Sequence, residues 1–451
     1  MDIIKRDGRK VKFDHMKIVD AILKAFKEID GTITDYALVK AGNIADYIAE
    51  YAEECDHELT IDEIQNFVEK GLMSTKRKDV AKSYIEYRHD RDKERQWNNH
   101  MMNVIKEKLQ ASNVQNQNAN IDEYSFGGRK GEADSVLMKQ FALDNCMSKK
   151  SRERHLANEI YIHDLDSYAI GMHNCLSIPF DDLLAKGFNT RQTDIRPANS
   201  ANTAFQLFAV IFQLQSLQQF GGVSATHLDW TMVPYVRKSF FRHYVVAYLK
   251  SLPEFQDLDL LNLLFEDYDD EAGIVRNKFD DWIDDNKEEF LDKFNLKIED
   301  FTFDNKENLD SAFYQCALYD TIVEVKQAVE AMYHNLNSLQ SRSGNQLPFT
   351  SINYGTCTSE EGRLVIKALI DGSIKGVGKF HKTSIFPCGI FQVGKGINKH
   401  KGDPNYDLFR RALKSTAKRL YPNYANLDWS GNAGYDPNDP RTYFSTMGLV
   451  A

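Results

Sequence analysis

The cysteine at position 388 lies in the stretch that is most easily connected to chemistry, HKTSIFPCGIFQ, residues 381–392. Residues 383–386 predict a short strand, and Pro387 ends it because proline has no N–H to donate to a neighbouring strand. We therefore expect Cys388 at a strand end, with apolar residues resuming at Ile390. A thiol held there would be fixed in place and kept from water. The simpler interpretation is a small buried hydrophobe, as most single cysteines are.

A second group of polar side chains lies in residues 158–180, NEIYIHDLDSYAIGMHNCLSIPF. Tyr161–Ile162 predict the start of a short strand, and His173, Asn174 and Cys175 close the segment. Imidazole, carboxylate and thiolate groups bind metals, but this spacing matches no standard site, so we expect no metal. The favoured interpretation is a buried strand end where His173 and Asn174 satisfy backbone groups and Cys175 faces a cavity.

Composition limits the classes of partner and compartment. The net charge of −10 argues against nucleic acid as the main partner. The sequence contains no apolar run long enough for a membrane span and no apolar signal region at its start. Six cysteines without a CxxC pair fit neither a disulfide scaffold nor a zinc site within this chain, which indicates the cytoplasm: 55, 146, 175, 316, 357 and 388.

The first 95 residues predict a small helical unit behind a β-hairpin. Residues 3–13 have apolar ends around a turn at Asp7–Gly8, and Asp14 is placed to cap the helix that follows. Further helices are expected over about 35–53, from Thr60 onward, where Glu63 has capping-box spacing, and in the run VAKSYIEYRHDRDKER. The basic residues of the hairpin suit phosphate binding, but from their chemistry alone a solvated hairpin is the favoured interpretation.

The remaining chain predicts a second domain over 122–451, after a linker over 96–121 that is rich in Asn and Gln. It opens with a Gly-rich turn, YSFGGRKGEADS, before a helix over 132–149. In the strongly helical stretch 197–250, the first half of residues 203–220 predicts a buried core helix, and residues 251–312 predict an exposed, acidic helical insertion. Strand ends, loops and helices then alternate, which is typical of an α/β barrel or sheet with polar residues at the strand ends.

The N-terminal pattern resembles an ATP-cone, the nucleotide-sensing module of ribonucleotide reductases and of one repressor family. The similarity rests on I-x-K-R-D-G-R at the start, on T-I-D-E-I-Q, and on a closing A-K-S-Y-I-E-Y-R. It implies that the hairpin closes over an ATP or dATP base and that Lys5 and Arg6 contact phosphates. The nucleotide-binding residues that it implies are Ile3, Lys5, Arg6, Asp7, Gly8, Gln65 and Arg88.

The later motifs, taken in order, resemble the catalytic subunit of the class III, anaerobic ribonucleoside-triphosphate reductases. These motifs are FGGRKGEADS, IYIHDLD-x7-HNC, QLPFTSINYGT, SIFPCGIFQ, GDPNYDLF-x4-K-x4-RLYP and YFSTMG. The resemblance covers residues 1 to about 448. It implies a ten-stranded α/β barrel of the glycyl-radical type behind the ATP-cone, a homodimer, and ribonucleoside triphosphates as substrates.

The resemblance also implies roles for individual residues. Cys388 would form the thiyl radical that takes the 3′ hydrogen of the ribose, and Cys175 would give hydrogen to C2′ from the opposite face. Asn174 would hold the substrate hydroxyls, and Asn405 would help on the other side. A separate radical-SAM activase would make the glycyl radical, and formate or a dithiol would supply the electrons.

The sequence departs from the family pattern at its end, YFSTMGLVA. In the family, MG is followed by a cysteine, the remaining barrel strands, a four-cysteine zinc site and the glycyl-radical loop. Leu449–Ala451 stand there instead, so we expect an incomplete barrel without its zinc and radical residues, and no reductase activity from this chain alone.

Three alternatives remain open. Enzymes of the pyruvate formate-lyase type resemble the barrel, but they carry an adjacent cysteine pair where this chain has Pro387–Gly389, and they lack an ATP-cone. A non-catalytic protein that senses ATP or dATP is the second possibility. The repressor that shares the ATP-cone needs a zinc ribbon, for which this sequence has no cysteines in place.

Overall fold

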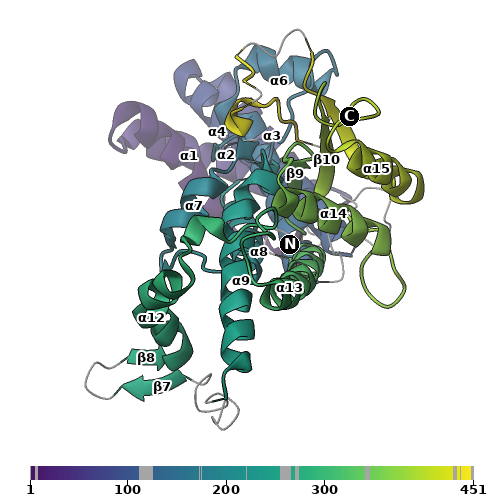
Figure 1. Cartoon of the computed structure of the whole chain (residues 1–451). Helices are drawn as coiled ribbons and strands as arrows, with labels where there is room; N and C mark the ends of the chain where they lie inside the picture. Colours follow the sequence, from purple (N-terminus) through teal and green to yellow (C-terminus); the bar gives the residue numbers. More distant parts are fainter. Residues whose placement is uncertain are drawn as a thin grey trace. The chain divides into compact units, whose positions relative to one another are not determined.

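The computed structural model describes residues 2–5, 9–110, 125–171, 173, 175–219, 221–253, 266–269, 274–340, 346–429, 434–436 and 438–447, without side-chain detail for 94–101, 107–110, 266–269, 274–282 and 284. Contacts divide the chain into two compact units, residues 1–110 and 111–451 (Figure 1). None of the described helices is both long and apolar enough to span a membrane.

The first unit is a β-hairpin with four helices. The strands β1 (Asp2–Ile4) and β2 (Lys10–Lys12) pair antiparallel, which confirms the predicted strands, while the turn between them lies outside the described residues. The helices are α1 (His15–Asp30), α2 (Asp35–Glu54), α3 (Ile61–Ser74) and α4 (Lys78–Gln110). Their facing sides form one apolar core, with Ile22, Phe26, Ile48 and Leu72 fully buried.

Of the two helix caps predicted in this unit, one is confirmed and the other is not. The predicted box at α3 is confirmed, because Thr60 N donates to Glu63 Oε2 at 2.8 Å and Glu63 N donates to Thr60 Oγ1 at 3.3 Å. Asp14 occupies the N-cap position of α1, but its side chain makes no capping hydrogen bond. Helix α4 continues through 96–110, the first part of the range assigned to the linker, and residues 111–121 lie outside the described residues.

The second unit alternates helices with short strands. Its helices are α5 (Phe126–Phe141), α6 (Lys149–Leu156), α7 (Phe180–Lys186), α8 (Ala201–Ser216), α9 (Leu228–Ser251), α12 (Lys278–Phe294), α13 (Ser311–Ser338), α14 (Glu360–Lys375) and α15 (Tyr406–Arg419), with a π-turn at Ala142–Cys146 and single 3₁₀ turns at Ile298–Asp300 and Pro440–Thr442. Its strands are β3 (Leu176–Ser177), β4 (Phe188–Asn189), β5 (Asp194–Ile195), β6 (Val223–Ala225), β7 (Glu266–Asp269), β8 (Ile274–Asn277), β9 (Thr350–Tyr354), β10 (Cys388–Val393) and β11 (Asn423–Asn426).

Five of these strands form a parallel sheet in the order β11-β10-β9-β6-β3. Parallel strands need crossover connections, and helices supply them: α7 and α8 between β3 and β6, α9 and α13 between β6 and β9, α14 between β9 and β10, and α15 between β10 and β11 (Figure 1). The predicted α/β class is therefore confirmed. Closure into a ten-stranded barrel stays a prediction.

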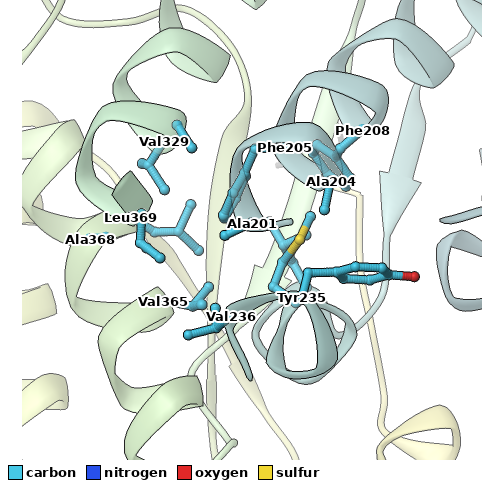
Figure 2. Close-up of a cluster of buried hydrophobic side chains, with 14 of the residues drawn as sticks. Ala201, Ala204, Phe205, Phe208, Tyr235, Val236, Val329, Val365, Ala368 and Leu369 are labelled. Atoms are coloured by element: carbon cyan, nitrogen blue, oxygen red, sulfur yellow. The ribbon is translucent and has the colours of Figure 1, made fainter. Parts of the chain in front are cut away.

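The main apolar core lies among the helices of this unit. Figure 2 shows side chains from four helices meeting there: Phe205 and Phe208 of α8, Val236 of α9, Val329 of α13 and Leu369 of α14. All five are at most 1% exposed, and the prediction that α8 is a buried helix is confirmed. Because the sheet packs against these helices, their rigidity fixes where each strand begins and ends.

Three local predictions in this unit are wrong. The Gly-rich turn at 122–131 is helical from Phe126, because Ser125 caps α5 through a 2.9 Å bond from Gly128 N. Tyr161–Ile162 form no strand, and Ile162 N donates to the His155 ring instead. The described part of 251–312 contains the hairpin β7–β8 as well as a helix, and its aromatic residues Phe290, Phe301 and Phe303 are buried in the core rather than exposed.

Candidate active site

Cys388 is the first residue of β10, and it is 3% exposed. The strand predicted over 383–386 is wrong, so this cysteine begins a strand rather than following one. The N–H groups of Ile385 and Phe386 donate to the side-chain oxygen of Asn337 in α13, at 2.7 and 3.2 Å, instead of to a neighbouring strand. Since Asn337 is far away in the sequence, local patterns could not indicate this arrangement.

The thiol of Cys388 has a largely apolar environment with one polar neighbour. Its Sγ lies 3.5 Å from the hydroxyl of Tyr421. Burial raises the pKa of the Cys388 thiol, and the hydrogen bond with Tyr421 only partly opposes this. The pKa of Tyr421 is raised as well, first by burial and then by Cys388. The sulfur therefore keeps its proton at neutral pH, which suits hydrogen-atom chemistry better than nucleophilic attack.

Cys175 directly precedes β3, at the same edge of the sheet as Cys388. Its side chain is exposed, and its Sγ accepts a 3.3 Å hydrogen bond from Gly222 N. The strands β9 and β6 lie between the two cysteine-bearing strands. Three strand spacings of about 4.8 Å each amount to roughly 14 Å, so the structure does not bring the two thiols together.

One face of the sheet is lined mainly by small and amide side chains, with Ile390 between Cys388 and Gln392. The register places Ser177, Ser224 and Ser351 in a row with Cys388. Asn353 lies two residues further along β9 and Gln392 four residues beyond Cys388 on β10, so the alternation of a strand directs both to that same face. Apart from Ser177, these residues are buried. We call this set of Ser177, Ser224, Ser351, Asn353 and Gln392 the polar face.

An extended segment, residues 443–447, lies across the polar face. Asn353 forms a reciprocal pair with Thr446: its Nδ2 donates to Thr446 O at 3.0 Å, and its Oδ1 accepts from Thr446 N at 3.1 Å. Gln392 Nε2 donates to Phe444 O at 3.0 Å. Two neighbouring strands therefore bind alternate residues of one passing segment.

The two remaining predicted site residues of this unit are placed differently. Asn405 is fully buried at the start of α15, where its Nδ2 donates to the carbonyl of Cys357 at 2.8 Å and its Oδ1 accepts from Arg363 at 2.8 Å. Cys357 follows β9, so Asn405 lies at the opposite edge of the sheet from Cys388. Asn174 lies outside the described residues, and the roles assigned to both asparagines stay predictions.

Sequence reasoning missed Asp229, which organises that opposite edge. Its Oδ2 accepts hydrogen bonds of 2.9 Å from each of three consecutive backbone N–H groups in the loop after β9, those of Gly355, Thr356 and Cys357. The side chain is fully buried, and burial raises the pKa of Asp229 against the effect of these bonds. The motif HLDW carried an available signal, an acidic residue in the first turn of a predicted helix.

A cavity of ≈ 620 Å³ next to that edge was also missed. Its wall includes the ion pair of His227 and Asp181, whose Nε2 and Oδ2 atoms are 2.8 Å apart, together with Trp230, Lys238 and Arg441. The other ring nitrogen of His227 lies 2.7 Å from the hydroxyl of Thr226. The lining comes from three separate stretches, around Asp181, over 227–238 and over 438–441, so no single local motif indicated the cavity.

The residues predicted to bind a nucleotide in the first unit are only partly described, because Arg6, Asp7 and Gly8 lie outside the described residues. Ile3 is 7% exposed and pairs with Val11 in the hairpin. Lys5 is exposed, and its N–H donates to the carbonyl of Arg9. The neighbouring Ile4 N donates to Leu59 O at 2.9 Å, which brings Lys5 close to the start of α3.

Gln65 and Arg88 come from adjacent helices, α3 and α4. Gln65 is half-buried. Arg88 is ion-paired with Glu69 at 2.7 Å and donates to the side chain of Asn66 at 2.8 Å. A phosphate would therefore have to compete with a carboxylate for this guanidinium group.

Comparison with protein families gives two matches. Residues 117–448 match the family model described as anaerobic ribonucleoside-triphosphate reductase. Residues 1–93 match the model of the ATP cone domain.

Individual relatives agree with both matches. The chain is 30% identical to an anaerobic ribonucleoside-triphosphate reductase of Haemophilus influenzae over 430 residues, which is 94% of this chain and 52% of the relative. An Escherichia coli protein of the same name is 28% identical over 429 residues, 94% of this chain and 51% of that protein. The chain thus spans about half the length of these curated relatives.

Solved structures are similar as well, and one of them illustrates the extent of the match. This one is the anaerobic ribonucleotide reductase from Thermotoga maritima in complex with dATP and CTP, with a TM-score of 0.43 and 11% sequence identity. The match covers 74% of this chain and 48% of that one.

Proposed function

The chain belongs to the anaerobic ribonucleoside-triphosphate reductase family, and we propose that it takes part in reducing ribonucleoside triphosphates to deoxyribonucleoside triphosphates by radical chemistry. The observation that carries this proposal is the family match over residues 117–448. The structure adds a parallel α/β sheet with one polar, buried face, which suits a ligand that must be held away from water.

The chemistry proposed for Cys388 starts from a sulfur radical. The radical takes the hydrogen atom from C3′ of the ribose, which forms an S–H bond and leaves a radical on the sugar. The 2′-hydroxyl then leaves as water, hydrogen is delivered to C2′, and C3′ takes its hydrogen back from the sulfur. In total, two electrons and two protons are consumed for each product. The burial of Cys388 supports this role because oxygen and water are excluded from the thiol.

Cys175 is proposed as the source of the hydrogen at C2′. Its support is its position at the same edge of the sheet as Cys388. Since the sheet order separates the two thiols, a ribose could meet both only if the sheet curved around it. The two cysteines therefore need separate tests.

The remaining partners follow from the family alone. We propose a homodimer, a radical-SAM activase that generates the initiating glycyl radical, and formate or a dithiol as the electron source. A cytoplasmic location is proposed as well, on the basis of the scattered cysteines.

The first unit is proposed to bind ATP or dATP as a regulatory ligand. The match to the ATP cone domain supports this, and so does the exposed ammonium group of Lys5 directly after β1, which suits a charge-assisted contact with a phosphate. A Lys5→Ala variant should bind dATP at least about tenfold more weakly, since a charge-assisted contact contributes 1.5 kcal/mol or more. Lys17→Ala removes an equally exposed lysine on α1 and serves as the control.

The proposal is tested with the native protein purified anaerobically from its own cells. After reductive activation with S-adenosylmethionine, it is supplied with each ribonucleoside triphosphate, and the products are separated by chromatography. We expect deoxyribonucleoside triphosphates whose formation responds to ATP and dATP. Nucleotide binding without any deoxy product would favour a non-catalytic nucleotide sensor instead.

A further inference from the structure

The segment over the polar face is bound by its backbone rather than by its side chains. Asn353 contacts the N–H and the carbonyl of Thr446, and Gln392 contacts the carbonyl of Phe444. Phe444 and Thr446 are two residues apart, so both carbonyls of an extended chain point to the same side. The two amides thus bind the segment in the way that a neighbouring strand would.

Both amides also tie the segment to the end of β6. Asn353 Nδ2 donates to the carbonyl of Ala225 at 2.9 Å, and Gln392 Nε2 lies 3.4 Å from the carbonyl of Thr226. Because carbonyl oxygens surround one end of each side-chain amide, that end must be the nitrogen and the other end the oxygen. The two fully buried side chains therefore join β6, β9 and β10 to residues 443–447.

The arrangement of Gln392 has a cost that an apolar side chain would avoid. Its Oε1 is buried and has no hydrogen-bond partner among the described residues. A methionine would fill similar space without a buried unpaired acceptor. The hydrogen bond from the amide nitrogen to the carbonyl of Phe444 therefore explains why a glutamine, rather than an apolar residue, occupies position 392.

We propose that Asn353 and Gln392 are positioning residues that set the register of residues 443–447 across the polar face. A slip of one residue would turn both carbonyls away from the amides, so only one register satisfies the two side chains. The value of this register for the reaction rests on the proposed function, because it depends on the polar face being the reaction site. The register itself can be measured without any turnover.

The test is hydrogen exchange with peptide-level mass spectrometry on the full chain. Gln392→Met and Asn353→Leu are near-isosteric and remove the amide donors. We expect the peptide containing Thr446 to exchange at least about tenfold faster in Asn353→Leu, because the N–H of Thr446 loses its acceptor. Gln392→Met should give a smaller acceleration in that peptide. Peptides from β9 and β10 should change less than about twofold.

The matched control is Asn405→Leu. Asn405 is an equally buried amide that also donates to backbone carbonyls, but it does so at the opposite edge of the sheet. We expect this variant to leave the exchange of 443–447 unchanged. If Asn353→Leu does not fold, Gln392→Met alone decides the question.

The proposal is overturned if 443–447 exchanges at the wild-type rate in the folded variants, or if Asn405→Leu accelerates it equally. In the native enzyme, both positioning variants should lower kcat for deoxynucleotide formation while leaving KM for the ribonucleotide within about twofold, since they do not touch the substrate. A wild-type protein that makes no deoxy product but shows the expected exchange pattern would refute the proposed function and leave the register intact.

Discussion

Phe391 and Gln392 are consecutive residues of β10, both fully buried, and they lie on opposite faces of one sheet. Phe391 faces the helices and packs against the rings of Tyr354, Phe409 and Tyr424. Gln392 faces the segment 443–447 and makes directed hydrogen bonds. The difference shows that burial alone does not define a role: one face stabilises the fold by packing, and the other orders a passing chain.

The largest effect on stability should come from the helix-covered face. Phe391→Ala removes a fully buried ring and leaves a cavity, so we expect the free energy of unfolding of the second unit to fall by about 3–5 kcal/mol. Gln392→Met keeps the volume and should cost less than about 1.5 kcal/mol. Denaturant titration of both variants measures this difference. Equal losses would mean that the two faces contribute alike.

The loop after β9 should show the next largest effect. Asp229→Ala leaves three buried N–H groups without their acceptor, and we expect a loss of about 3 kcal/mol in the free energy of unfolding. Asp182→Ala is the control, because this exposed aspartate contacts only Lys186 in the described structure and should change stability by about 0.5 kcal/mol or less. A loss below about 1 kcal/mol for Asp229→Ala would contradict the importance of these bonds.

The free energy of unfolding of the second unit should also fall at acid pH, because of Glu324 in α13. Burial works to raise the pKa of this carboxyl, but hydrogen bonds from His243, Asn202 N and Ser239 outweigh it and hold the pKa below its ordinary value. A carboxylate whose pKa is lowered by folding stabilises the fold above its unfolded pKa of about 4.3, and this stabilisation is lost as the pH falls.

We therefore expect the free energy of unfolding of the wild type to decrease more steeply below about pH 5 than that of Glu324→Gln. Thermal unfolding followed over a series of pH values provides the slopes. Parallel slopes in the two proteins would show that Glu324 has no such role.

The smallest effect should be confined to the first unit. Thr60→Ala removes the confirmed capping box of α3 and should destabilise that unit by about 1 kcal/mol. Ser74→Ala, at the other end of the same helix, is the control. Calorimetry should show a shift in the transition of the first unit only. A shift of the second unit by the same amount would mean that the two units unfold together.

Local signals predicted local structure well. Thr60 and Glu63 identified the start of α3, and the apolar run after Thr203 identified a buried helix, because caps and periodicity act within a few residues. Two of the wrong predictions have long-range causes. The segment before Cys388 is held by Asn337, and the aromatic residues after α12 pack against α9, neither of which is visible in a short window.

The candidate site likewise combines local features that the sequence predicts with long-range features that it does not. The sequence predicted polar residues at strand ends, but the polar face depends on strand register, and the partner of Asn353 lies in a segment some 90 residues later in the chain. Neither the pairing of Asn353 with Thr446 nor the distance between Cys388 and Cys175 can be derived from spacing. The separation of the two thiols follows from the sheet order, and the pairing with Thr446 follows from the path of residues 443–447 across the sheet; only the folded chain defines either.

The central claim is that Cys388 performs the radical step, and Cys357 offers a matched comparison. Both cysteines are buried, at 3% and 1% exposure, but they lie at opposite edges of the sheet. The decisive measurement is deoxyribonucleoside triphosphate formation by the activated native protein carrying Cys388→Ser or Cys357→Ser. We expect no product from Cys388→Ser and near wild-type product from Cys357→Ser. Undiminished product from Cys388→Ser would contradict the account, because an alcohol O–H cannot replace the thiol as the radical site.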